Sequence, residues 1–221
     1  MLKRIIVILL AVGALGAGAG LWWVNSGADS LKAQNQTDIA TNMQTSWAAT
    51  GGLEPQKGVP QLGFTPDSSA PFAVLHVPAF GKDYKRPVAQ GIDTALVLQK
   101  YGFGHLASTP LPGFPGNMVF TGYRNHDGSS LANLSSVKVG DHIYVETLWG
   151  WYDYLVNNAR KVGAKETTYL NPVPFTEKAV DGYYLTIVIA GERKDAADSF
   201  VASAKYTKFY PRAAGAPAEL K

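Results

Sequence analysis

The sequence contains no cysteine, and this absence excludes several kinds of chemistry at once. Without a thiol the chain cannot form a disulfide, bind a metal through thiolates, or carry a lipid on an N-terminal cysteine. It also cannot attack a substrate with a cysteine thiolate of its own. The four histidines are scattered and lack acidic residues at ligand spacing, so the sequence predicts no metal site and no cofactor.

Charge is also scarce, since 17% of the 221 residues are charged and the net charge is +3. No run of Lys or Arg indicates a nucleic-acid partner. Glycine and proline, in contrast, are plentiful at 23 and 13 residues, and 46% of the chain is hydrophobic. Because glycine and proline mark turns, this mixture favours a mainly β domain with many short strands.

The longest hydrophobic run predicts a transmembrane helix near the N-terminus. Residues 1–4 end in two basic side chains, and residues 5–24 are apolar without interruption. At about 1.5 Å per residue, such a run is just long enough to cross a bilayer core of roughly 30 Å. Trp22 and Trp23 stand at its outer end, where aromatic rings favour the membrane interface. The preceding positive charges predict a single-pass protein of the cell membrane, with a cytoplasmic N-terminus and an exported C-terminal domain.

Small residues within this run leave two alternatives open. Gly16 and Gly20 form a small-residue pair that lets a second transmembrane helix approach closely. The triplet at residues 17–19 resembles a signal-peptide cleavage site. Both alternatives export the protein, and the paired tryptophans beyond the triplet favour a retained anchor.

Residues 25–71 are mostly polar and predict a juxtamembrane helix followed by a linker. The helix is expected to begin near Ser30, because apolar residues recur four apart along one face. The linker is expected over residues 50–71, which are rich in proline and glycine. The apolar positions of the predicted helix are Leu31, Ile39, Met43 and Trp47, with Asn35 at the missing step.

Residues 72–212 predict one β-rich domain, and residues 213–221 a short C-terminal tail. Four segments have the β-branched and aromatic content of strands: FAVLHVPAF, DHIYVETLW, WYDYLVNN and YYLTIVIA. Gly150 predicts a tight hairpin between the second and third of these strands. Residues 94–102 are expected to form one short helix.

Four motifs in this domain resemble those of sortases, the cell-wall transpeptidases of Gram-positive bacteria, and are most similar to the actinobacterial type called class E. They cover about residues 72–205 and occur in the order found in that family. The resemblance implies a closed, eight-stranded β-barrel with short helices, preceded by a membrane helix. The motifs are FAVLHVPAFGKDYKRPVAQGID, GHLASTPLPGFPGNMVFTGYR, LANLSSVKVGDHIYVET and YYLTIVIAGERKDAADSFVASA.

The resemblance also implies a mechanism. A cysteine thiolate attacks a Thr–Gly peptide bond, a histidine transfers protons, and an arginine stabilises the oxyanion. The motifs place Ala190 at the cysteine position, Tyr123 at the histidine position and Ser199 at the arginine position. Alanine carries no nucleophile, tyrosine has an ordinary pKa near 10, and serine is uncharged. We therefore expect a degenerate sortase that is not an enzyme.

Other polar residues near the motif positions are candidates for a binding groove. A serine enzyme with relocated groups, a transpeptidase or peptidase using Ser199 and His126, is an alternative to pure binding. Four histidines, among them His76 and His142, are interpreted mainly as structural or surface residues. The candidate groove residues are His105, Thr109, Tyr123, Arg124, His126 and Arg193.

The leading interpretation from sequence is a membrane-anchored protein that acts by binding. It is expected to serve as an accessory or scaffold subunit of an actinobacterial cell-envelope complex, for example a respiratory one. The expected partners are membrane or envelope proteins, which contact Gly16, Gly20, Trp22 and Trp23 or the barrel surface, and a peptide ligand fits the same interpretation. A cell-wall-binding module is a further alternative.

Overall fold

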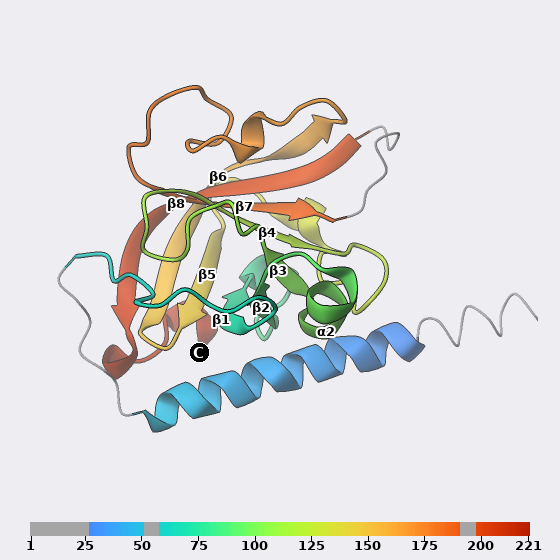
Figure 1. Cartoon of the computed structure of the whole chain (residues 1–221), viewed down its shortest axis with the longest axis vertical. Helices are drawn as coiled ribbons and strands as arrows, with labels where there is room; N and C mark the ends of the chain where they lie inside the picture. The colour runs from blue at the N-terminus through green and yellow to red at the C-terminus, as the bar shows by residue number, and fades with distance from the viewer. Residues whose placement is uncertain (1–26, 51–57, 191–197) are drawn as a thin grey trace, which may run out of the picture.

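The structure is a computed structural model that describes residues 27–50, 58–190 and 198–221 (Figure 1). Among these residues, no helix combines the length and the apolar character needed to cross a membrane. The predicted features that fall outside the described residues are the transmembrane run 5–24, with Gly16, Gly20, Trp22 and Trp23, and the groove candidate Arg193.

Eight strands close into a barrel in the order β1-β2-β3-β4-β7-β8-β6-β5. Most neighbours are antiparallel, but β2 pairs with β3 and β4 with β7 in parallel. This architecture confirms the predicted mainly β, eight-stranded barrel. The strands are β1 (Pro71–His76), β2 (Lys85–Gln90), β3 (Phe103–His105), β4 (Gly116–Gly122), β5 (His142–Thr147), β6 (Gly150–Gly163), β7 (Tyr183–Ile189) and β8 (Asp198–Pro211).

The helices that join these strands are short, as expected. The helix predicted over residues 94–102 is present as a π-helical turn, η2 (Thr94–Leu98), followed by one α-helical turn, α2 (Gln99–Tyr101). The Asp93 carboxylate accepts a hydrogen bond of 2.7 Å from Leu96 N and caps the start of η2. The other short helices are η1 (Pro78–Phe80), η3 (Leu134–Ser136), η4 (Thr168–Leu170), η5 (Arg212–Ala214) and η6 (Ala218–Leu220).

Alternate side chains of each strand fill the barrel. Phe120 of β4, Leu185 of β7 and Ala202 of β8 belong to one buried apolar cluster together with Ile143 and Val145 of β5. Because successive side chains of a strand point to opposite faces, the residues between them lie on the outer face. The predicted hairpin is present, since β5 and β6 are joined by a turn of two residues and pair in register.

A helix over residues 27–49 lies along the outside of the barrel and passes close to α2 (Figure 1). The sequence predicts this helix, but its contact face differs from the expected apolar stripe. Leu31 is 63% exposed, whereas Gln36 and Ala40 are buried against the domain. The first half of the helix therefore packs through polar groups.

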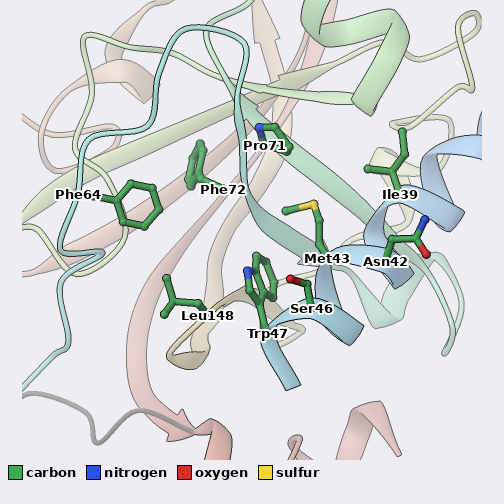
Figure 2. A pocket seen from close by; sticks show the side chains of 9 residues that line it. All are labelled: Ile39, Asn42, Met43, Ser46, Trp47, Phe64, Pro71, Phe72 and Leu148. Carbon is green, nitrogen blue, oxygen red and sulfur yellow. The ribbon is translucent and has the colours of Figure 1, made fainter. Parts of the chain in front are cut away.

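The second half of the helix borders an apolar pocket of about 370 Å³. Figure 2 shows Met43 and Trp47 pointing from the helix toward the barrel side of this pocket. The residues that line the pocket are Ile39, Asn42, Met43, Ser46, Trp47, Phe64, Pro71, Phe72 and Leu148.

Segments before and after the strands also pack on the barrel. Leu62, in the predicted linker, is fully buried, and its carbonyl oxygen accepts a hydrogen bond of 3.0 Å from Trp149 Nε1. In the predicted C-terminal tail, the Glu219 carboxylate accepts a hydrogen bond of 2.8 Å from the Tyr144 hydroxyl. Both segments are thus attached to the domain by specific contacts.

Candidate functional site

The ends of three neighbouring strands bring together the positions that the sequence analysis singles out. In the β4–β7 pair Gly122 faces Ile189, and in the β7–β8 pair Val188 faces Val201. The backbone N–H of Ala190 donates to the Gly122 carbonyl oxygen at 2.7 Å and extends the first pairing by one residue. The three positions, hereafter the site positions, are Tyr123, Ala190 and Ser199.

The site positions lie on the outer face of the barrel. Phe120 and Ile189 belong to the interior cluster, and Phe200 packs against it. Tyr123 comes three residues after Phe120. Ala190 comes one residue after Ile189, and Ser199 one residue before Phe200. Since side chains alternate, the site positions share the opposite, outer face. The sequence motifs therefore correspond to one surface of the folded chain.

Tyr123 is packed rather than projecting into solvent. Its side chain is 8% exposed, and its hydroxyl lies 3.1 Å from Thr94 Oγ1 of η2. Partly buried Ala190 packs against the cluster that contains the tyrosine. The whole cluster consists of Ala89, Val97, Leu98, Tyr101 and Tyr123, with Ile39 and Ala190 at its edge.

The loop after Tyr123 places a histidine on the tyrosine ring and a carboxylate beside that histidine. The rings of Tyr123 and His126 have centroids 3.9 Å apart and an interplanar angle of 39°. His126 Nδ1 lies 2.9 Å from Asp127 Oδ2, and Lys32 of the long helix forms an ion pair with the same carboxylate.

The ionised carboxylate of Asp127 determines which nitrogen of a neutral His126 donates a hydrogen bond and which accepts one. Burial would raise the pKa of Asp127, but hydrogen bonds from Lys32, His126 and Gln99 outweigh it and hold the pKa below its ordinary value. An ionised carboxylate accepts a hydrogen bond from the Nδ1–H of a neutral histidine, which leaves Nε2 of His126 as a hydrogen-bond acceptor.

Ser199 occupies the third site position with an unsatisfied hydroxyl. Its Oγ atom is buried and has no hydrogen-bond partner among the described residues. On β8 it faces Val162 of β6. Because buried hydroxyl groups are usually paired, this one is a candidate for interaction with a substrate or ligand.

His105 and Thr109 are placed elsewhere. His105 Nε2 lies 3.0 Å from Thr109 Oγ1, and its Nδ1 lies 2.7 Å from Gln90 Oε1. Its ring packs edge-on against Phe72 and Phe120, so it faces the interior of the barrel. Burial lowers the pKa of His105 to about 4.

These two residues border a second pocket of about 410 Å³, lined by Thr65, Gln90, His105, Ala107, Thr109, Pro110, Leu111, Phe114 and Pro115. Of the predicted groove residues, the structure thus brings His126 to Tyr123 but puts His105 and Thr109 in this separate pocket. Arg124 is exposed.

Sequence reasoning missed the acidic partners of two histidines, His76 and His142. His76 Nε2 lies 2.8 Å from Glu146 Oε2, and His142 Nδ1 lies 2.6 Å from Asp153 Oδ1. These two pairs join residues 70 and 11 apart in the sequence, so no local spacing indicates them. In the described part of the chain, no group of three or more such side chains is arranged to hold a metal ion.

Comparison with known proteins gives consistent matches. The Sortase domain model matches residues 75–206. Sortase SrtE1 of Streptomyces coelicolor is 28% identical over 211 residues, which cover 90% of this chain and 54% of that relative, so the chain spans about half the length of that protein.

Solved structures also match the barrel. Sortase E of Streptomyces avermitilis has a TM-score of 0.63 and 26% identity, covering 72% of this chain and 100% of that one. Sortase E1 of Streptomyces coelicolor with a tripeptide in its active site has a TM-score of 0.61 and 26% identity, covering 71% of this chain and 100% of that one. The predicted likeness to class E sortases is therefore confirmed.

The comparisons correct one prediction. The expectation that the chain is not an enzyme, drawn from Tyr123, Ala190 and Ser199, is wrong, because the matching family consists of transpeptidases and nothing shows that activity has been lost. The absence of cysteine shows only that this sequence supplies no thiolate nucleophile, not that the protein lacks activity. On the match of the Sortase domain to residues 75–206 and on these relatives, the chain belongs to the sortase family.

Proposed function

We propose that this chain is a membrane-anchored sortase-family protein that binds an extended peptide of another cell-envelope protein on the outer face at the site positions. The observation that carries the proposal is the grouping of Tyr123, Ala190 and Ser199 at three neighbouring strand ends. The tripeptide in the active site of the related sortase E1 supports a peptide as the class of ligand.

Exposed apolar side chains on either side of Thr94 in the sequence offer contacts to such a peptide. Ile92 is 48% exposed and Leu96 is 60% exposed, and they flank Thr94, whose hydroxyl bonds to Tyr123. Exposed large apolar side chains beside a packed aromatic ring are typical of recognition surfaces. Peptide side chains that cover Ile92 and Leu96 would remove apolar surface from water.

The barrel topology restricts how a peptide is bound. Strands β4 and β7 each have hydrogen-bonded neighbours on both sides in the closed barrel. A peptide therefore finds no free strand edge at the site positions and cannot bind there by adding a strand. Affinity must come from side-chain contacts, with Tyr123 and His126 as the central pair.

Binding is tested with the full-length protein in mild detergent. Fluorescent peptides that contain a Thr–Gly bond are titrated with the protein, and anisotropy is recorded. Tyr123→Ala should weaken binding by about tenfold or more, as expected for a central aromatic contact. Tyr183→Ala at the opposite end of β7 is the matched control and should bind normally. Equal affinity for both variants, or no binding by the unaltered protein, contradicts the proposal.

A role as a subunit of an envelope assembly is tested separately. Purification of the full-length protein in mild detergent, followed by mass spectrometry, should recover a membrane or envelope protein in stoichiometric amount. The same partner should be lost or reduced with Tyr123→Ala if it is held at the site positions. Recovery of a monomer alone contradicts the subunit role and leaves the peptide titration as the measure of binding.

A second candidate function is peptide-bond cleavage or transfer at Ser199, whose buried hydroxyl has no hydrogen-bond partner within the described residues. In that reaction Ser199 Oγ attacks the peptide carbonyl, and its proton passes through a base such as His126 Nε2 to the departing amine. The resulting ester then reacts with water or a second amine. No hydrogen bond joins these two residues within the described part of the chain, so the reaction requires the two side chains to approach each other.

The second candidate is tested by mass spectrometry of the same peptides after incubation with the protein. Ser199→Ala should abolish the products, whereas Ser203→Ala, on the same strand and face, should not. Products that persist in Ser199→Ala assign the reaction to another group. No product under any condition excludes Ser199 as a nucleophile for these peptides.

A further inference from the structure

The side chain of Gln36 is almost completely buried although it lies on a helix outside the barrel. It is 1% exposed. Its Nε2 donates to the carbonyl oxygens of Gln99 at 3.3 Å and Asp127 at 3.0 Å, and its Oε1 accepts from Ser130 Oγ at 3.4 Å. One amide therefore connects the helix over residues 27–49 to two other segments of the chain.

Both of these segments adjoin Tyr123. Gln99 begins α2, directly after the η2 turn whose Thr94 bonds to the Tyr123 hydroxyl. Asp127 belongs to the loop whose His126 packs, with its ring tilted, against the Tyr123 ring. The Gln36 amide thus joins the two elements that hold the tyrosine from different sides.

Two glycines leave the space that this amide occupies. A Cβ atom on Gly102 would lie 2.8 Å from Gln36 Oε1, and one on Gly128 would lie 2.5 Å from it. Both distances are shorter than real Cβ contacts, and both glycines have positive φ, +89° and +90°. The Gln36 amide therefore lies in space left by two glycines, together with the Ser130 hydroxyl, which a Cβ atom on Gly102 would also overlap.

The turn under the helix is conformationally unfavourable by itself. Asp127 and Ser129 have φ of 54° and 48°, so three consecutive residues, with Gly128, are left-handed. The Asp29 carboxylate accepts from Gly128 N at 3.4 Å and from Ser129 Oγ at 3.1 Å. Left-handed non-glycine residues persist only where their surroundings enforce them. Here the helix stabilises the left-handed conformation of the turn through the Asp29 carboxylate.

Three residues of the helix contact this turn. They are three and four positions apart and therefore lie on the same face of the helix. Asp29 bonds to Gly128 and Ser129, Lys32 pairs with Asp127, and Gln36 bonds to the Asp127 carbonyl oxygen. We propose that Asp29, Lys32 and Gln36 are positioning residues of the candidate site. Through the 127–129 turn they hold His126 against Tyr123. The effect on peptide affinity rests on the proposed function, but the positioning does not.

The test compares Gln36→Ala with Gln34→Ala in the full-length protein in detergent. Gln34 is an exposed glutamine two residues earlier on the same helix, and is therefore a matched control. Histidine-selective NMR reports on all four imidazoles, with His126 assigned through His126→Gln. The contact with the Tyr123 ring shifts the His126 ring protons away from their random-coil positions. Gln36→Ala should move only these signals toward random coil, and Gln34→Ala should move none.

A second variant keeps the proposal testable if Gln36→Ala folds poorly. Gln36→Met fills the same space without hydrogen bonds and should also release His126, whereas a merely space-filling role predicts unchanged signals. His76, His105 and His142 report on the barrel and should keep their shifts. Unchanged His126 signals in both variants, or equal shifts of all four histidines, overturn the proposal.

The same samples separate this proposal from the proposed function. If Gln36→Ala releases His126 and the unaltered protein binds no peptide, the positioning role is supported and the peptide-binding function fails. If the unaltered protein binds peptide and Gln36→Ala leaves both His126 and the affinity unchanged, the positioning role fails and the function is supported.

Discussion

Ala190 donates its backbone N–H to the carbonyl oxygen of Gly122 at 2.7 Å, and this bond fixes the end of β7 beside the end of β4. Tyr123, the next residue after Gly122, therefore belongs to the apolar cluster against which Ala190 packs. A tyrosine ring and a methyl group fit together where the sortase resemblance implies an imidazole and a thiol. Partly buried Ala190 packs against the cluster that contains Tyr123, so Tyr123 is expected to limit access to position 190.

Access to position 190 is measurable because the chain has no other thiol. In Ala190→Cys the introduced thiol should react slowly with a soluble disulfide reagent, since apolar burial limits both entry and thiolate formation. The double variant Ala190→Cys/Tyr123→Ala should react faster. Ser135→Cys, at an exposed position, sets the rate of an open thiol. Equal rates for the single and double variants would show that Tyr123 does not cover this position.

The hydrogen bond between Tyr123 and Thr94 should be detectable as a coupling in stability. Tyr123→Phe and Thr94→Val each remove one partner of the 3.1 Å contact and should each cost about 1 kcal/mol in the free energy of unfolding. Urea denaturation of the double variant should show little further loss, because the bond is already absent. Fully additive losses would indicate that the two hydroxyl groups contribute independently.

The barrel and the clustering of the site positions follow from sequence, because strand-forming segments and family motifs are local. YYLTIVIA becomes β7, which is covered on both sides, and the turn at Gly150 becomes the β5–β6 hairpin. The buried role of Gln36 does not follow, since a glutamine on a thin amphipathic helix has the pattern of a solvated residue. Its partners are 63 and 91 residues away and are brought to it only by barrel closure.

The partners of Glu146 are also distant in the sequence, and its buried contacts predict a large effect on stability. Its carboxylate is 1% exposed and lies 2.8 Å from His76 Nε2, 2.9 Å from an Arg212 guanidinium nitrogen and 2.6 Å from Gln44 Nε2. Glu146→Gln leaves the Arg212 charge without its carboxylate and should cost about 3–5 kcal/mol in urea denaturation. The control Glu166→Gln removes an exposed pair with Arg160 and should change stability little.

The acid dependence of stability should report on the same carboxylate. Burial would raise the pKa of Glu146, but His76, Gln44 and Arg212 outweigh it and hold the pKa below its ordinary value. A lowered native pKa contributes stability above the unfolded-state value, about 4.3, and the contribution is lost as the pH falls through the native value. Stability measured by urea below about pH 4 should fall less steeply in Glu146→Gln than in the unaltered protein. Equal slopes would mean that the pKa of Glu146 is the same in the folded and the unfolded protein.

His105 should affect the stability of the protein at higher pH than Glu146 does. Burial lowers its pKa from 6.5 to about 4, so below pH 6.5 the unfolded chain binds a proton that the folded chain does not. Stability should therefore be fully present above pH 6.5 and should decrease as the pH falls toward about 4. At 1.36 kcal/mol per pKa unit, the decrease is about 3 kcal/mol.

Substitution isolates this contribution. His105→Gln should be less stable at neutral pH, because it disturbs the bonds to Gln90 and Thr109, but its stability should vary less between pH 6.5 and 4. His142→Gln changes a partly exposed histidine and leaves His105 in place, so the steep fall should remain. Urea denaturation across this pH range distinguishes the two variants. If His105→Gln keeps the full slope, the pKa of His105 is not lowered in the folded barrel, and another group causes the loss of stability at acidic pH.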